Sequence, residues 1–312
     1  MEKITFINSQ GLSVELGEES PFILTKIEGT GAVKTNIHTH MSPCQDGVTY
    51  TSNNLEPRSL SIEIMVLGEN EVDIANKRQK LLKIFNPKLE QGRLIYEFGN
   101  ITREIKAISE IAPAFPENNR NFKDTMQPGL IQLYCPDPFW KDLEEDSTDL
   151  VTWIPNLEFP FSTEQTPNYW IETGEPFEEF QSGFGTGEGI EFGYRLLNQI
   201  VEIDNIGDVD TPLRVLFRAS ADVVKPFIQN METYELLRIN KILKAGDTLE
   251  IITEYGNKNI YLNGEKAHQY LDFLNSTWLQ LKPGINLIKY GAESGINTLE
   301  CRVFYTPKYL GV

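Results

Sequence analysis

The sequence predicts a mainly β protein, in which an N-terminal α+β domain with one main helix is followed by a β-sandwich domain. Three observations lead to this prediction. Only residues 70–85 carry a long helical pattern, and from residue 199 onward short strand patterns alternate with turn signals about every 8 to 12 residues. The length of 312 residues favours two domains. We place them at residues 1–141 and 151–312, with residues 142–150 as a linker.

The N-terminal domain opens with short strands and a long polar segment. Residues 3–27 alternate apolar and polar side chains around a turn at residues 9–11. Residues 29–57 are rich in turn-forming residues and have no strong period, which predicts an irregular arm. Such a segment is longer than a simple connection requires, so we expect it to have a function of its own.

A strand followed by a helix forms the centre of this domain. Residues 59–68 alternate with the period of a half-buried strand. Asn70 fits an N-cap, and Asn86 with Pro87 ends the helix. The apolar side of the helix should pack on the sheet, and it comprises Ile74, Ala75, Leu81, Leu82 and Phe85.

A hairpin and a closing strand complete the domain. The turn Gly99-Asn100 joins strands at residues 93–98 and 101–108. An irregular stretch follows, and the next strand ends before Pro136, because proline cannot continue a ladder. The acidic run at residues 142–149 is interpreted as a solvated linker, where nothing would shift carboxylate pKa values toward acid–base catalysis.

Residues 151–193 contain too many aromatic side chains for disorder. These are Trp153, Phe159, Phe161, Tyr169, Trp170, Phe177, Phe180, Phe184 and Phe192. They are interpreted as packing residues, with stacking on sugar rings as the alternative. The glycine-rich residues 183–189 lack the Lys-Ser/Thr pair of a phosphate loop and carry Glu188 instead, so a phosphate site is rejected.

The remaining sequence predicts about eight short strands, no long helix and no catalytic constellation. The strands are expected within residues 199–203, 213–219, 234–239, 248–254, 259–264, 277–281, 285–292 and 298–305, with a further stretch around residues 224–231. Because no Ser-His-Asp, Cys-His or metal grouping occurs there, the sequence nominates no catalytic, cofactor-binding or metal-binding residue. We therefore expect a protein that is not an enzyme.

One grouping in the arm deserves a metal hypothesis, since His38, His40 and Cys44 are close in sequence. Zinc sites need three or four ligands, and the only other histidine is His268. We interpret the arm histidines as incidental. The three cysteines are odd in number and far apart, which indicates free thiols.

Charge and hydropathy restrict the possible partners. The formal charge of −17 argues against specific nucleic-acid binding, which depends on clustered Lys and Arg. No apolar run approaches the roughly 18 residues of a membrane span, and the N-terminus lacks the regions of a signal peptide. These features predict synthesis in a cytoplasm without membrane insertion.

A series of short motifs runs through both halves of the chain. The first half contains QDGVTY, Pro57-Arg58 before a strand, and CPDPFW. The second half contains LEFPF, EFG, NIGD, AGD, LNG and LKPGIN, and the chain ends in VFYTPKYLGV. In this order the motifs resemble the distal tail protein family of siphophages that infect Gram-positive bacteria. One departure is an extended aromatic and acidic segment at residues 162–188.

The resemblance implies a structural protein of the virion tail tip, or baseplate. It implies a homo-hexameric ring that joins the tail tube protein to tail-associated host-contact proteins, such as a tail fibre or tail lysin, and to a receptor-binding protein. The N-terminal domain would form the ring, and the C-terminal domain would be a galectin-like sandwich. We expect the arm to reach a neighbouring subunit, because a long arm without a core of its own suits an interface repeated around a closed axis. The alternative is a carbohydrate-binding protein that recognises host cell-wall glycans through this sandwich.

Overall fold

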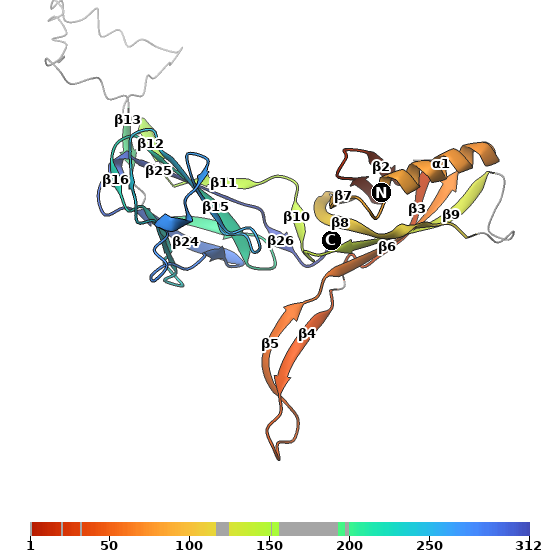
Figure 1. The fold of residues 1–312 in the computed structure, drawn as a ribbon, viewed down its shortest axis with the longest axis horizontal. Helices are drawn as coiled ribbons and strands as arrows, with labels where there is room; N and C mark the ends of the chain where they lie inside the picture. The colour runs from red at the N-terminus through yellow and green to blue at the C-terminus, as the bar shows by residue number, and fades with distance from the viewer. Residues whose placement is uncertain are drawn as a thin grey trace, which may run out of the picture.

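The computed structural model has two β-rich lobes and a narrow arm that projects from the first lobe (Figure 1). It describes residues 2–19, 21–31, 33–116, 125–150, 152–155, 193–196 and 200–312. The one α-helix among these described residues lies in the first lobe. The prediction of a mainly β fold with one main helix is thereby confirmed.

An antiparallel sheet in the order β2-β1-β7-β8-β9-β6-β3 forms the first lobe. Its strands are β1 (Glu2–Ile7), β2 (Ser13–Leu16), β3 (Phe22–Glu28), β6 (Arg58–Leu67), β7 (Gly92–Phe98), β8 (Ile101–Ala114) and β9 (Met126–Cys135). The two ends of this path meet, because the Gly17 N–H donates to the Phe22 carbonyl and the Leu24 N–H donates to the Gly17 carbonyl. The sheet thus closes around one apolar core.

Helix α1 (Glu71–Ile84) covers one side of this core. The Asn70 side chain accepts a hydrogen bond from the Asp73 N–H, which confirms the predicted N-cap. Leu81 and Phe85 are fully buried, and Phe85 stacks on Phe6 with ring centroids 4.6 Å apart. The expected apolar side is wrong in detail, because Ala75 is exposed, Leu82 is only half-buried, and Ile84 is buried instead.

Two expectations for the first lobe need correction. The segment expected to be an irregular arm is a regular hairpin of β4 (Thr35–His40) and β5 (Thr49–Leu55). Strand β8 runs to Ala114 and not only to residue 108, because it bends through two bulges from its pairing with β7 to its pairing with β9. The hairpin between β7 and β8 turns at residues 99–100 as predicted.

The second lobe contains two antiparallel sheets. One has the order β11-β25-β15-β20-β21-β22, with β23 on β15, and the other has the order β14-β24-β17-β18. The strands of the first are β11 (Asp146–Asp149), β15 (Thr211–Ala219), β20 (Thr248–Ile252), β21 (Asn259–Leu262), β22 (Glu265–Lys266), β23 (Gln280–Leu281) and β25 (Leu299–Tyr305). Those of the second are β14 (Ile200–Asn205), β17 (Phe227–Asn230), β18 (Leu236–Arg238) and β24 (Gly284–Gly291).

A single apolar core lies between these two sheets. Phe217 and Val303 face it from one sheet, and Ile203 and Ile288 face it from the other. Smaller elements surround the sandwich, namely the pair β16 (Val223–Val224) and β19 (Ile242–Leu243) and the 3-10 turns η1 (His268–Tyr270) and η2 (Ile296–Thr298). The expected two-layer sandwich is therefore present in the described part of the lobe.

The boundary between the lobes differs from the expected linker at residues 142–150. Strand β10 (Trp140–Asp142) pairs with β8, and β11 pairs with β25, so most of the acidic run is ordered β structure. Leu150 is fully buried in the core of the second lobe. At the other end of the chain, β26 (Lys308–Tyr309) returns to pair with β10 of the first lobe.

After β11, β12 (Thr152–Pro155) pairs with β13 (Gly193–Leu196) at the end of the second lobe that is away from the first lobe (Figure 1). The aromatic and acidic segment at residues 162–188, and the glycine-rich residues 183–189 within it, lie outside the described residues. No helix in the described part of the chain is long and apolar enough to cross a membrane.

Candidate assembly interface

The arm has no core of its own. Every residue of β4 is exposed, and every residue of β5 except Leu55 is exposed. An isolated two-stranded hairpin is only marginally stable in water. The arm therefore has the character of an element that becomes buried against another surface.

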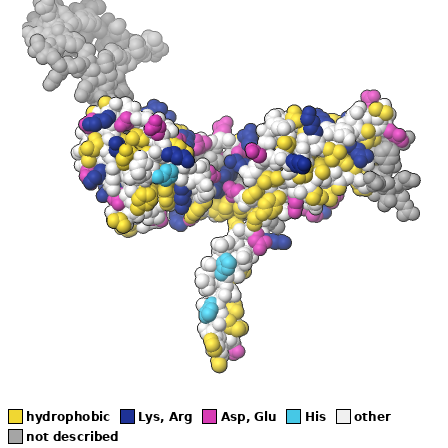
Figure 2. Space-filling model, in the orientation of Figure 1, with side chains coloured by type: hydrophobic (Ala, Val, Ile, Leu, Met, Phe, Trp, Pro, Cys, Tyr) yellow, Lys and Arg dark blue, Asp and Glu magenta, His cyan; other side chains and the backbone are white. Residues whose placement is uncertain are grey.

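The strand register gives the arm two different faces. Ile37 pairs with Asn53 and Thr39 with Tyr50, while His38 pairs with Ser52. A bulge between His38 and Thr39 brings Tyr50 onto the face of Ile37. The side chains of Ile37 and Tyr50 are each 60% exposed. Figure 2 shows hydrophobic side chains along one side of the arm and the histidines on the other.

The arm histidines do not assemble a metal site in the described residues. His38 and His40 lie two residues apart on the polar face, and Cys44 is exposed in the connecting turn. No group of three potential His, Cys, Asp or Glu ligands occurs in the part of the chain that the structure describes. His268 lies in the second lobe, where its Nε2 is 3.2 Å from the Lys258 carbonyl.

A buried arginine holds the root of the arm. Arg58 is only 2% exposed, and its guanidinium donates to the carbonyls of Gly29, Thr30, Pro138 and Leu310. Burial lowers the pKa of Arg58. No carboxylate of the described residues pairs with it, so its charge is stabilised by carbonyl dipoles and by the Trp140 ring, whose centroid lies 5.9 Å from Arg58 Cζ.

The last residues of the chain, 306–312, form a C-terminal tail that connects both lobes. The Tyr309 hydroxyl donates to Asp142 over 2.9 Å, and the Arg103 guanidinium lies 3.4 Å from the Tyr309 ring centroid. Burial and the Asp142 carboxylate raise the pKa of Tyr309 to about 12. The Leu310 N–H donates to Asp208 of the second lobe. The tail thus fixes the second lobe to the first.

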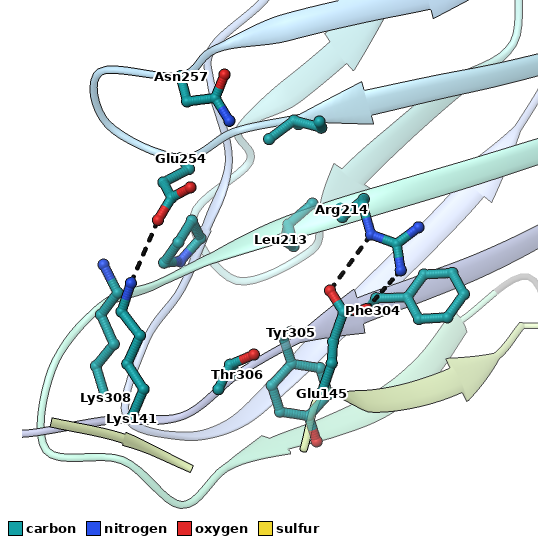
Figure 3. A pocket seen from close by; sticks show the side chains of 12 residues that line it. Lys141, Glu145, Leu213, Arg214, Glu254, Asn257, Phe304, Tyr305, Thr306 and Lys308 are labelled. Atoms are coloured by element: carbon teal, nitrogen blue, oxygen red, sulfur yellow. Dashed lines mark hydrogen bonds and ion pairs between the residues drawn. The ribbon is translucent and has the colours of Figure 1, made fainter. Parts of the chain in front are cut away.

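A cleft of about 280 Å³ lies where the lobes meet (Figure 3). Lys141 pairs with Glu254 across it at 3.3 Å, and Arg214 pairs with Glu145. Both carboxylates that line the cleft are therefore held by basic side chains, which leaves no free acid–base pair there. Burial lowers the pKa of the neighbouring Lys308.

The acidic run is exposed to solvent at residues 143–147 and 149, but it is not a free connection because it participates in this junction. Glu145 binds Arg214, Asp142 accepts from Tyr309, and Asp149 makes a two-point contact with Arg302. These contacts fasten β10 and β11 to the lobes on either side. The sequence did not predict these contacts, because acidic composition alone does not reveal arginine partners distant in sequence.

On the outer face of the sheet β14-β24-β17-β18, the one aromatic side chain among the described outward positions is Phe227, and the Arg238 guanidinium lies 5.6 Å from its ring centroid. In the described residues, the outward positions of these strands carry neither Trp nor Tyr; they are Ile200, Glu202, Asp204, Phe227, Gln229, Leu236, Arg238, Ile285, Leu287 and Lys289. The aromatic residues proposed for stacking lie outside the described residues, except for Trp153, whose backbone belongs to β12.

Comparison with known proteins identifies related families for both lobes. The model of the phage tail protein RIFT-related domain matches residues 9–135, and that of the siphovirus-type tail component C-terminal domain matches residues 206–309. No curated protein sequence matches the chain significantly.

Two solved structures are similar to the whole chain. One is the crystal structure of Dit (gp 19.1) of phage SPP1, described as a paradigm of the hub adsorption apparatus in phages that infect Gram-positive hosts. It has 13% identity and a TM-score of 0.65, and the match covers 98% of each chain. The other belongs to the phage P2 baseplate in its activated conformation with Ca, with 9% identity, full coverage of both chains and a TM-score of 0.48. The SPP1 protein shares the fold of this chain.

Proposed function

The chain belongs to the distal tail protein family of siphophages and is a structural component of the phage tail; from this premise we propose that six copies form a ring at the tail tip. The ring joins the tail tube protein on one side to tail-associated host-contact proteins, a tail fibre or tail lysin, on the other. A receptor-binding protein is a further partner. The protein is synthesised in the host cytoplasm and functions in the virion.

The exposed arm is the observation that carries this proposal. A hairpin without a core gains stability only when a second surface covers its apolar face. Contacts between unlike surfaces of identical copies close into a ring when the rotation between copies permits it. The first lobe, from which the arm extends, therefore supplies the ring-forming surfaces.

The second lobe is proposed to be a galectin-like sandwich that faces away from the ring. It is held by the C-terminal tail and by the Lys141–Glu254 ion pair. A non-enzymatic role suits the cleft, whose carboxylates are already paired. Glycan recognition stays the secondary candidate, and titration of wall glycans into the full chain tests it.

Electron microscopy of the purified full chain tests the ring directly. Images with six-fold symmetry are expected, together with a hexamer mass by light scattering. The matched variant lacks residues 35–55, joined by two glycines, because the Glu56 N–H already donates to the Lys34 carbonyl at the root. This variant should be a folded monomer. Hexamers of the armless variant would exclude the arm as the connector, and particles without six-fold symmetry would refute the ring.

A further inference from the structure

The outer face of β9 is a second surface with the properties of an interface. Along β9 the side chains alternate between buried and half-buried, and Tyr134 at its end is 37% exposed. Next to Gln132 on this face stands Ile111 of β8, which is 46% exposed. Figure 2 shows hydrophobic side chains along the edge of the first lobe where β6, the partner of β9, runs in Figure 1.

Charge is absent from this strand and nearly absent from the arm. Strand β9 has no Lys, Arg, Asp or Glu. In residues 35–55 the only residue of these four types is Asp46. The chain as a whole has 28 basic and 45 acidic residues among 312. A surface strand that faces water normally carries charged residues at its outward positions, so their absence at this site indicates a surface that another chain covers.

The net charge favours uncharged surfaces for contacts between copies of this chain. Copies that each carry a formal charge of −17 repel one another, and the repulsion is smallest where both surfaces are uncharged. The interior of a protein–protein interface is likewise depleted of charged residues. The side chains of the apolar face of the arm and of the outer face of β9 meet both conditions, and Glu63 of the neighbouring strand β6 lies beside Leu130 at the border of this surface.

We propose that the apolar face of the arm, Ile37 and Tyr50 with Met41 and Val48 near its tip, packs on the outer face of β9 of a neighbouring copy. The inference rests on the proposed ring and names the surface that receives the arm. The occupant is a second copy because the arm points away from its own lobe (Figure 1). Among the described residues, the arm does not cover the β9 face of its own copy.

The dimensions of the two surfaces are compatible. Strand β4 has 6 residues and β5 has 7, which gives a paired length of about 20 Å. Strand β9 has 10 residues and extends over about 34 Å. The arm can therefore lie along β9 over its full paired length. The contact joins unlike surfaces, so it propagates from copy to copy around a ring.

Cysteine cross-linking of the full chain tests this contact. In a Cys44→Ser background, whose two remaining cysteines are buried, Tyr50→Cys is combined with Gln132→Cys. Mild oxidation should produce a ladder of covalent oligomers. The matched control places the cysteine on the polar face of the arm, as Ser52→Cys with Gln132→Cys, and should produce no ladder.

A second pair of variants measures the same contact without cysteines. Ile37→Glu places a charge on the apolar face and should raise the concentration for half-assembly at least about tenfold, whereas His38→Glu on the opposite face should leave it unchanged. Equal ladders from both cysteine pairs, or equal effects of both glutamates, would overturn the proposal. Assembly by light scattering without any ladder would overturn this contact alone, whereas a monomeric wild-type chain would overturn the ring as well.

Discussion

Replacing Arg58 with methionine is expected to destabilise the protein by about 3 kcal/mol. The guanidinium donates to four carbonyls, and one of them, Thr30, keeps a donor in the Trp140 indole N–H at 3.0 Å. The other three lose their only side-chain donor, at a cost of about 1–3 kcal/mol each. The variant also avoids the desolvation penalty of burying the guanidinium charge, and this gain offsets several kcal/mol of the loss. The loss of hydrogen bonds exceeds this gain because all four partners are fixed backbone groups.

Urea unfolding of the full chain measures this difference, and hydrogen exchange locates it. Protection should fall first at residues 29–31 and 308–312, the segments that Arg58 joins. The control is Arg93→Met, because Arg93 makes an exposed ion pair with Glu104 and its removal should cost less than about 1 kcal/mol. Equal destabilisation by the two variants would refute the reasoning, since it would mean that water satisfies the carbonyls around Arg58.

Four further predictions follow from the packing and charge of the protein. Phe85→Ala should cost on the order of 3–5 kcal/mol in urea unfolding, because Phe85 is fully buried and stacked on Phe6; unchanged stability would mean that the helix packs elsewhere, for instance on another subunit. The phenol of Tyr309 ionises near pH 10 when unfolded and near 12 when folded, so its contribution is complete below pH 10 and is lost between pH 10 and 12. The stability of Tyr309→Phe should therefore fall less steeply in that window, and parallel profiles would contradict this. A fragment of residues 1–141 should assemble, but with a lower melting temperature than the same fragment supplied with a peptide of residues 306–312; no effect of the peptide would show that the tail is dispensable. The lumen of the assembled ring should be rich in Asp and Glu, and affinity of the ring for DNA at physiological salt would contradict an acidic lumen.

Local chemistry made part of the first lobe predictable from sequence. The Asn70 cap and the two-residue turn at residues 99–100 each depend on interactions within a few residues, and both occur where the sequence places them. The side of the helix that packs was less predictable. Ala75 and Leu82 fit the helical period, but the position of the sheet decides which positions within that stripe are covered.

The strands of the arm escaped prediction because sequence periodicity reports burial. Both faces of the hairpin are exposed, so no apolar residues alternate with polar ones toward a core of its own. The bulge after His38 also breaks the period of two. A hairpin whose burial depends on another chain therefore resembles an irregular loop in its own sequence.

The C-terminal tail illustrates a different limit. Leu310 lies 252 residues from Arg58, and its carbonyl accepts a hydrogen bond from the Arg58 guanidinium. Nothing in the sequence near either residue indicates the other. The arginine itself carries the available signal. A single basic residue stands between Pro57 and an apolar strand, and when it is buried it needs hydrogen-bond acceptors. Distant backbone carbonyls supply them here, even though Glu56 is close in sequence.

Charge distribution gives information on the assembly surface that periodicity does not. In an acidic chain, the charged side chains of two copies repel each other over most of their surfaces. An exposed stretch without charged residues therefore indicates a surface where copies can make contact. Strand β9 and the arm are two such stretches, and they lie on one lobe with the arm directed away from the strand. Each is apolar enough to need a cover, and neither covers the other within one copy. Contact between neighbouring copies covers both surfaces at once, because the arm of one copy becomes buried on the β9 face of the next copy.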